Sequence, residues 1–246
     1  MINRNGLILW EGPSRLDGSP IVVIATGLTT VTRNAKTGDM VQTYILQRDT
    51  HPLDSFQTDA GAAICGHCTH HGTEQATCYV NWGQGPAMVW KCYKNPETGY
   101  AKLEGSALGV PGLVGRHIRF GSAGDPAMVP ASVWIDLAQA SSGWTGYTHQ
   151  WREPWAADLQ GICQASCDSF ADYLEASSKG WQCYLVSKEK PAKGSGLIHC
   201  GASKERGKVT DCQTCGLCDG QTADVWIMPH GKKAAKFNPT GALAHA

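Results

Sequence analysis

Cysteine and histidine residues gather in one short polar segment, where their types and spacing suit metal binding. Its cysteines are Cys65, Cys68 and Cys78, with the spacing C-x2-C-x9-C. Three histidines lie between them, namely His67, His70 and His71. Thiolate and imidazole groups are ligands for zinc and iron, whereas a protein core does not need them together in a loop. The segment therefore predicts a metal or metal-cluster site.

Two kinds of metal fit this first cysteine group, which consists of Cys65, Cys68 and Cys78. With zinc, one of the nearby histidines would complete a tetrahedral set. With a [4Fe–4S] cluster, three thiolates leave one iron free to bind a small ligand. A metal with an open coordination position can take part in a reaction, whereas a fully coordinated metal serves a structural role.

A second cysteine group lies near the end of the chain and provides four ligands. It consists of Cys200, Cys212, Cys215 and Cys218, and its last three members form a C-x2-C-x2-C run. Ferredoxin-type [4Fe–4S] clusters use such close spacing, which favours an iron–sulfur cluster. Zinc remains the alternative, because a tetrahedral set of four sulfurs suits either metal. Four protein ligands leave no open position, so a structural role is expected for this site.

Composition and charge limit the classes of protein to which this chain can belong. The chain has 246 residues, with 21 Lys and Arg against 21 Asp and Glu, so no overall basic field attracts nucleic acid. The apolar run Ile21–Ala25 is too short to cross a membrane. No apolar stretch of signal-peptide length follows Met1, so we expect a cytoplasmic protein. In that compartment grouped cysteines indicate metal ligands rather than disulfides. Four scattered cysteines are predicted to be buried core residues: Cys92, Cys163, Cys167 and Cys183.

The elements that must position these ligands alternate along the chain. Strands are predicted at 7–10, 21–24, 41–46, 116–120, 144–149, 162–166, 181–186 and 224–228, and helices at 86–95, 130–143 and 169–180. Strand–helix–strand units of this length imply parallel pairing with right-handed crossovers. We therefore predict an α/β fold with an open or closed parallel (β/α) barrel, similar to a TIM barrel, over residues 1–190. Residues 191–230 would form a small cysteine-rich metal module with a final strand, and 231–246 a flexible tail.

Polar residues at the ends of the predicted strands are candidates for the site. Asp125, Tyr147, His149 and Asp168 would lie near carboxyl ends, where barrel sites form. Tyr147 and His149 are two residues apart, so both can point inward. The alternatives are structural. Asp125 could cap the following helix, and His149 could be a hydrogen-bonded histidine of the core or rim.

The order of these motifs resembles the radical SAM superfamily of iron–sulfur enzymes. In that family three cysteines after the first barrel strand, usually C-x3-C-x2-C, hold a [4Fe–4S] cluster with one open iron. Here Cys78 is followed by the aromatic Tyr79, and a later strand ends in Gly124-Asp125-Pro126. The resemblance implies that this turn binds S-adenosylmethionine, as a Gly-Gly-Glu-Pro-like turn does in the family. The chain departs from the family in its longer cysteine spacing and in Asp125, which replaces the usual glutamate.

A second likeness covers most of residues 7–230. The chain is similar to uncharacterised phage and plasmid proteins, among them a phage family known as a numbered gene product. The shared features are Asn34, Lys36-Thr37-Gly38, the loop from Cys65 to Tyr79, Gly124-Asp125-Pro126, Trp144 to Trp151, and Cys200 to Cys218. This likeness implies a phage- or plasmid-encoded protein in the host cytoplasm, without indicating a reaction.

Three hypotheses for function follow. The first is a radical SAM-like enzyme with an open-site cluster and an auxiliary cluster, a small-molecule or macromolecular substrate and a protein reductant; Asp125, Tyr147 and His149 would be its catalytic residues. The second is a non-catalytic iron–sulfur protein for electron transfer or redox sensing. The third is a zinc-stabilised phage protein that binds protein or nucleic acid through its nine tryptophans and its basic residues Arg116, Arg119, Arg152 and Lys232–Lys236.

Overall fold

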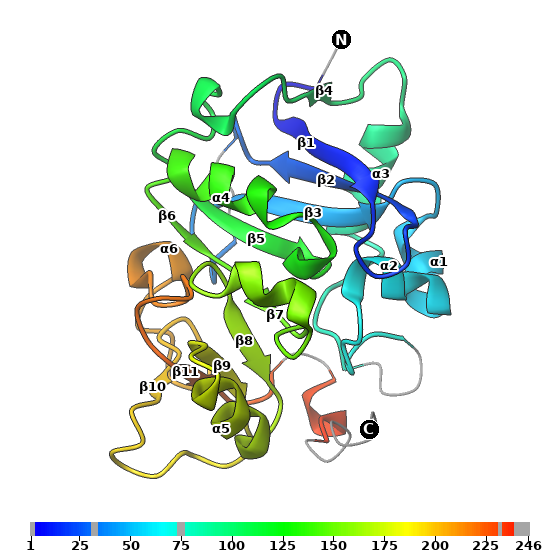
Figure 1. The fold of residues 1–246 in the computed structure, drawn as a ribbon. Helices are drawn as coiled ribbons and strands as arrows, with labels where there is room; N and C mark the ends of the chain where they lie inside the picture. The colour runs from blue at the N-terminus through cyan, green and yellow to red at the C-terminus, as the bar shows by residue number, and fades with distance from the viewer. Residues whose placement is uncertain (1–2, 31–33, 73–76, 231–232, 239–246) are drawn as a thin grey trace.

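The strands of the protein form two sheets, which meet where the chain passes from β6 to β7 (Figure 1). The computed structural model describes residues 3–30, 34–72, 77–230 and 233–238. The first sheet has the order β4–β1–β2–β3–β5–β6 and the second β10–β11–β9–β8–β7. A mixed α/β fold with parallel strands is therefore confirmed. Closure into a barrel and the division of the chain into three parts stay predictions.

The first sheet combines an antiparallel and a parallel half. Strands β1, β2 and β3 are antiparallel neighbours, whereas β4 joins β1, and β5 joins β3 and β6, in parallel. The run Ile21–Ala25 of β2 is fully buried, as expected for a continuous apolar strand covered on both faces. The bounds are β1 Gly6–Pro13, β2 Pro20–Thr26, β3 Val41–Gln47, β4 Ala101–Lys102, β5 His117–Ala123 and β6 Gly143–Thr145.

The second sheet is parallel throughout. Strands β10 and β11 come from the cysteine-rich end of the chain and extend the sheet beyond β9. Cys200, Cys212 and Cys218 lie in a small apolar cluster of their own, with Val225 and Ile227 of β11. The bounds are β7 Tyr147–Thr148, β8 Gln164–Cys167, β9 Cys183–Val186, β10 Ile198–His199 and β11 Val225–Ile227.

Helices connect the parallel strands. The three predicted helices form, as α3 Gly85–Lys94, α4 Ala131–Ala140 and α5 Phe170–Ser178. Ser169 caps α5 by accepting a hydrogen bond from the backbone N–H of Asp172. Three short helices were not predicted from the sequence: α1 Pro52–Gln57, α2 Ala62–Cys65 and α6 Cys212–Cys215. Two of these, α2 and α6, carry cysteines of the two predicted ligand groups.

The strand predicted at 144–149 is interrupted at Gly146, and its two pieces belong to different sheets. The Gly146 N–H donates to the carbonyl of Cys218 at 3.1 Å, and the Gly146 carbonyl accepts from the N–H of Gln164 at 2.9 Å. A Cβ on Gly146 would lie 2.6 Å from the sulfur of Cys163. The prediction of one strand is therefore wrong, because the second cysteine group takes over the backbone hydrogen bond at this point.

The scattered cysteines divide into two kinds. Cys163, Cys167 and Cys183 are fully buried, as predicted. Cys92 is only half-buried, and its sulfur donates to the Thr98 carbonyl at 3.3 Å, so its assignment to the core is corrected. Among the described residues, no helix combines the length and the apolar character that a membrane crossing needs.

Replacing Gly124, which directly follows β5, tests how closely this part of the chain packs on β3. Its φ is +81°, and a Cβ there would lie 2.6 Å from the Cβ of Ile45 on β3. Gly161 has nearly the same φ, +82°, with open space around it. Alanine at either position meets backbone strain of about 1–2 kcal/mol, but Gly124→Ala adds overpacking that costs about 1–3 kcal/mol more. We expect Gly124→Ala to lower the free energy of unfolding by the larger amount in chemical denaturation. Equal losses would contradict the close packing of Gly124 on β3.

Candidate metal centres around a shared cavity

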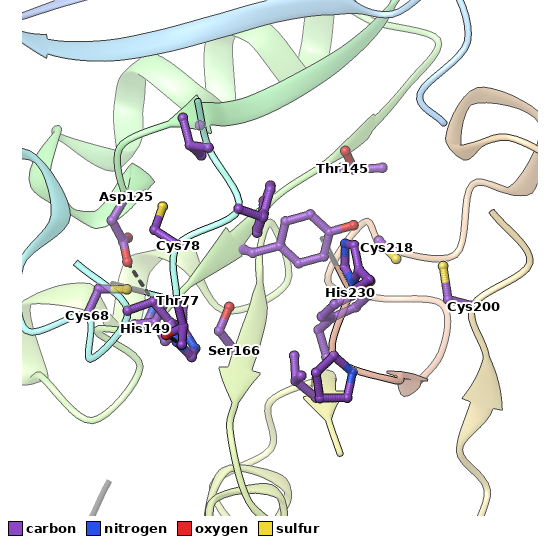
Figure 2. Close-up of a pocket in the computed structure, with 18 of the residues that line it drawn as sticks. Cys68, Thr77, Cys78, Asp125, Thr145, His149, Ser166, Cys200, Cys218 and His230 are labelled. Atoms are coloured by element: carbon purple, nitrogen blue, oxygen red, sulfur yellow. Dashed lines mark hydrogen bonds between the residues drawn. The ribbon is translucent and has the colours of Figure 1, made fainter. Parts of the chain in front are cut away.

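A cavity of about 190 Å³ lies where the parallel strands end. One buried water needs only about 10–15 Å³, so the cavity has room for a ligand. Figure 2 shows Cys68 and Cys78 on one side of it and Cys200 and Cys218 on the other. All seven cysteines predicted as ligands line this cavity: Cys65, Cys68, Cys78, Cys200, Cys212, Cys215 and Cys218.

The other predicted site residues gather at the same place, with one exception. Gly124, Asp125, Tyr147 and His149 also line the cavity. Pro126 does not; it is buried at the start of the short 3-10 helix η3, Pro126–Met128. Strand β5 of the first sheet and strand β7 of the second thus bring together residues that lie far apart in the sequence.

Backbone hydrogen bonds fold the first cysteine group into a compact loop. Cys65 is the last residue of α2, and its carbonyl accepts from the N–H of Cys68 at 3.3 Å. The N–H of Cys78 donates to the carbonyl of His70 at 3.1 Å, which returns the end of the loop to its start. Residues 73–76 of this loop lie outside the described part of the chain. The three sulfurs therefore face one region of the cavity.

Burial favours the neutral thiol form of Cys65 and Cys78. Burial raises the pKa of Cys65 well above its usual range, and the nearby Cys68, Cys78 and Asp125 raise it further. Burial also raises the pKa of Cys78. Metals bind thiolates rather than thiols. Loading a metal here therefore releases protons, and affinity for the metal increases with pH.

Gln150, which the sequence reasoning missed, clamps the first cysteine group to β7. Its side chain is buried; Oε1 accepts from the N–H of His67 at 3.0 Å, and Nε2 donates to the carbonyl of Cys65 at 3.2 Å. Gly66, with φ +58°, lets the amide come this close, because a Cβ there would lie 2.4 Å from the amide carbon of Gln150. Gly66 and Gln150 are far apart in the sequence, so no local sequence pattern predicts their contact.

Asp125 holds the backbone around the cavity with both carboxylate oxygens. Its Oδ1 accepts from the N–H of Ala127 at 3.0 Å, which caps η3, and its Oδ2 accepts from the N–H of His149 at 2.8 Å. The N–H of Asp125 in turn donates to the carbonyl of Ile64 at 2.7 Å. The capping role predicted as the alternative is thus present, and the same carboxylate fixes the start of the segment that carries His149.

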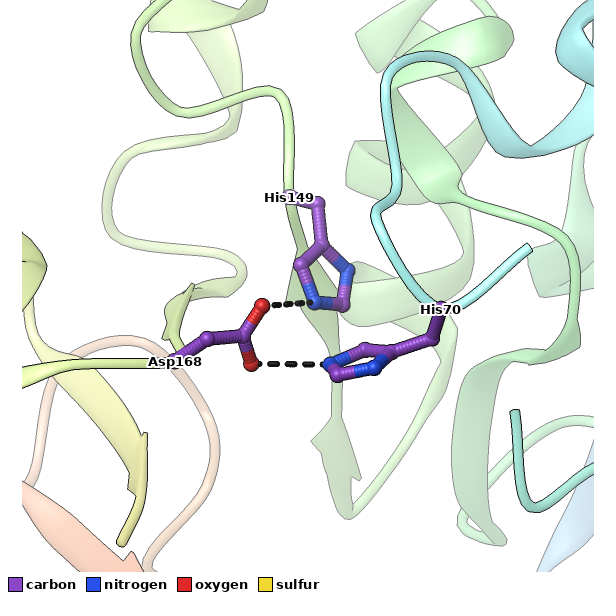
Figure 3. Close-up of side chains that lie close together, drawn as sticks. All are labelled: His70, His149 and Asp168. Atoms are coloured by element: carbon purple, nitrogen blue, oxygen red, sulfur yellow. Dashed lines mark hydrogen bonds and ion pairs between the residues drawn. The ribbon is translucent and has the colours of Figure 1, made fainter. Parts of the chain in front are cut away.

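The His149 imidazole lies between a thiol and a carboxylate. It hydrogen-bonds to the thiol of Cys68, and its Nε2 is 3.6 Å from Oδ2 of Asp168. Asp168 also accepts from Nε2 of His70 at 2.9 Å (Figure 3). Burial lowers the pKa of His149, but Cys68 and Asp168 outweigh it and raise the pKa well above its usual value. Burial likewise raises the pKa of Asp168, but its contacts with His149 and His70 hold that pKa well below the usual range.

A turn near the start of the chain supports the second cysteine group. The N–H of Cys212, the first residue of α6, donates to the carbonyl of Lys36 at 2.9 Å. The Gln213 side chain accepts from the N–H of Asp39 at 2.8 Å. The residues 34–38 form a tight turn, closed by a hydrogen bond from the Gly38 N–H to the Asn34 carbonyl at 2.9 Å. The predicted Asn-x-Lys-Thr-Gly turn therefore forms, and it packs against the helix that carries two ligands.

Positive charge faces the second cysteine group. Arg119 is buried, with 8% of its surface exposed, and its Nη2 donates to the hydroxyl of Tyr79 at 3.0 Å. Among the described residues, no carboxylate lies within 4.0 Å of this guanidinium. Burial raises the pKa of Cys212, while Arg119 and Lys36 oppose that rise. Four thiolates on a divalent centre carry a net double negative charge, which these two cations balance.

Tyr147 belongs to the second group, although it is only two residues from His149. Its hydroxyl hydrogen-bonds to the thiol of Cys218, and its ring centre lies 4.8 Å from that of Tyr184 and 5.4 Å from the guanidinium carbon of Arg119. The strand β7 and the residue after it therefore reach both ends of the cavity. Because Tyr147 and His149 are two residues apart, the sequence correctly predicts that both side chains lie on one face of the strand. The spacing does not show that the two side chains contact different cysteine groups.

The arginines considered for nucleic-acid contacts have partners within the chain. Arg119 is buried in the cavity wall, Arg116 pairs with Asp39 at 3.2 Å, and Arg152 pairs with Asp172 at 2.6 Å. Lys232 lies outside the described residues. These arginines are therefore poor candidates for free phosphate contacts.

Comparison with protein-family models, with curated proteins and with solved structures gives no match for this chain. The chemistry of the site must therefore be inferred from its own residues.

Replacing Gln150 tests whether it holds the first cysteine group. Removing its amide leaves the N–H of His67 and the carbonyl of Cys65 without this partner, at a cost of about 1–3 kcal/mol. We expect Gln150→Ala to lower the free energy of unfolding by this amount and to reduce the metal content of the purified protein. Gln160→Ala is the matched control, because Gln160 is exposed, donates to the carbonyl of Lys179 and does not line the cavity. A Gln150→Ala protein with full metal content and unchanged stability would refute the clamp.

Proposed function

We propose that this protein is an iron–sulfur enzyme with two [4Fe–4S] clusters. The first cysteine group would hold a cluster with one open iron, and the second group an auxiliary cluster with four thiolate ligands. One observation carries this proposal: all seven cysteines line a single cavity, and Figure 2 shows Cys68 and Cys78 on one side of it and Cys200 and Cys218 on the other. A cavity between an open coordination site and a second redox centre suits a substrate that reacts between them.

The spacing of the sulfurs favours clusters over single zinc ions. Around one zinc ion, with bonds of about 2.3 Å, tetrahedral sulfurs lie about 3.8 Å apart. Among the described residues, no three cysteine sulfurs come within 4.8 Å of one another. A four-iron cluster binds each thiolate to a separate iron and so accommodates a wider set.

The finer proposal is a radical SAM-like reaction, which rests on the resemblance of the motifs. Gly124 and Asp125 line the cavity, and Asp125 is close enough to add to the effect of burial on the pKa of Cys65. A carboxylate has about four lone-pair sites, so Asp125 can accept a bond from an ammonium group besides its two backbone bonds and the bond from Nε2 of Gln150 at 3.4 Å. When bound, S-adenosylmethionine would supply the radical chemistry at the open iron, with an electron from a reductant protein. The parallel strands would surround the substrate in a barrel-like arrangement.

Iron analysis of cysteine variants tests the two-cluster proposal. Protein purified and reconstituted without oxygen should contain about eight irons and be brown, because two four-iron clusters are present. Cys78→Ala and Cys215→Ala should each lose about half of this iron, since each removes one ligand of a different group. Cys92→Ala is the control, because Cys92 lies outside the cavity lining, and it should retain all of the iron.

A colourless protein that holds zinc and no iron after reconstitution would refute the proposal. Four irons that disappear with Cys215→Ala but not with Cys78→Ala would reduce it to one cluster. Binding of S-adenosylmethionine, measured on the fully loaded protein and on Cys78→Ala, then tests the finer proposal separately.

A second candidate function is electron transfer without catalysis, and one set of contacts favours it. Tyr79, next to the first-group ligand Cys78, bonds to Arg119; Arg119 lies over the ring of Tyr147, and Tyr147 bonds to Cys218. This series of side chains links the two cysteine groups across the cavity. It suits the passage of electrons between two clusters whether or not a substrate binds there.

The charge of Arg119 provides a test of coupling to the second cluster. Reduction adds negative charge to a cluster, and a nearby cation favours that reduction. We expect Arg119→Met to make the reduction potential of the second cluster more negative, measured by electrochemical titration with magnetic resonance detection. Arg48→Met should leave both potentials unchanged, because Arg48 pairs with Asp49 at the surface. The same potential in the Arg119→Met protein as in the wild type would refute this coupling.

A further inference from the structure

His70, His149 and Asp168 form a compact group outside both sets of cysteines. Their ligand atoms all lie within 4.8 Å of one another (Figure 3). His70 comes from the cysteine loop, whereas His149 and Asp168 follow the strands β7 and β8. All three side chains line the shared cavity.

The separations within this group are compatible with one shared metal ion, and His70 and Asp168 also form a hydrogen bond. Nε2 of His70 is 2.9 Å from Oδ1 of Asp168, and Nε2 of His149 is 3.6 Å from Oδ2. A normal N–H···O hydrogen bond spans about 2.7–3.2 Å, so the second contact is too long for one. Nitrogen and oxygen ligands about 2.0–2.2 Å from one ion lie roughly 3.0–3.5 Å apart. The two contacts lie close to that range.

Each candidate ligand also makes a further contact that supports its position. The other ring nitrogen of His70, Nδ1, bonds to the hydroxyl of Thr77 at 2.7 Å. Oδ2 of Asp168 accepts from the hydroxyl of Thr69 at 3.2 Å, and His149 bonds to Cys68. Metal-ligating histidines almost always use their second ring nitrogen in this way, which fixes the tautomer and the direction of the ring.

We propose that His70, His149 and Asp168 bind one divalent transition-metal ion, distinct from the metals of the two cysteine groups. Two imidazoles and one carboxylate suit ions such as Fe²⁺, Mn²⁺ or Zn²⁺. Three protein ligands leave positions open for water or for an oxygen of a substrate in the cavity. This site uses none of the seven cysteines as ligands and does not depend on the proposed iron–sulfur function.

Binding of Mn²⁺ tests the site, because this ion prefers oxygen and nitrogen ligands and competes poorly for thiolates. The anaerobic protein, with its cysteine groups loaded, is titrated with Mn²⁺ while the magnetic resonance signal of free Mn²⁺ is recorded. We expect one ion per chain to bind. Losing a residue that only supports a ligand weakens metal binding by about 10–100-fold, so Thr77→Val should fall in that range. His70→Gln, which loses a ligand but keeps a hydrogen-bonding side chain, should weaken binding at least as much.

His67→Gln is the matched control, because His67 lies in the same loop but is exposed. It should bind Mn²⁺ as the wild type does. The proposal is overturned if the wild type binds no Mn²⁺ at millimolar concentrations, or if His70→Gln and His67→Gln bind it equally. Thermal melting of each variant identifies one that fails to fold, and Thr77→Val then provides the comparison. Iron content of the same samples reports separately on the cysteine groups.

Discussion

Parallel strands bring their carboxyl ends to the same edge of a sheet, and this geometric constraint assembles the candidate site. The segments that follow β3, β5, β7 and β8 supply the first cysteine group, Asp125, His149 and Asp168. Each segment then fixes the next through a buried hydrogen bond, such as those from the His149 N–H to Asp125 and from the Asp125 N–H to Ile64. The ligands are therefore positioned by strand ends, although most of them lie in loops.

The sequence predicts those parts of the structure that are determined locally. The run Ile21–Ala25 indicates a buried strand, Ser169 a helix cap, and cysteine spacing two groups of cysteines, which the fold brings to one cavity. The interruption at Gly146 could not be predicted, because it depends on the carbonyl of Cys218, which lies far along the chain. For the same reason, the hydrogen bonds of Gln150 and the grouping of His70 and His149 around Asp168 could not be predicted from the sequence. The residues in these contacts come from segments far apart in the sequence, so no local periodicity or spacing predicts the contacts.

The two ends of the cavity differ in their charges. Around the first cysteine group, carboxylates are paired with imidazoles, as in the contacts of Asp168 with His70 and His149. Around the second group, Arg119 and Lys36 act on Cys212, and no carboxylate pairs with Arg119 among the described residues. A buried cation is costly without a counter-charge. If the second group binds a metal as proposed, its thiolates would supply that charge, and the site and Arg119 would stabilise each other.

The contact between Lys36 and Cys212 also bears on the order in which the chain assembles. A ribosome releases the N-terminal part first, and contacts between distant residues form late because they must overcome the entropy of closing a long loop. The first cysteine group therefore leaves the ribosome while the cavity still lacks the wall formed by α6 and β11. If the first group binds a metal as proposed, the metal can reach it during synthesis, before the C-terminal cysteines pack against the turn at 34–38 and complete the cavity wall.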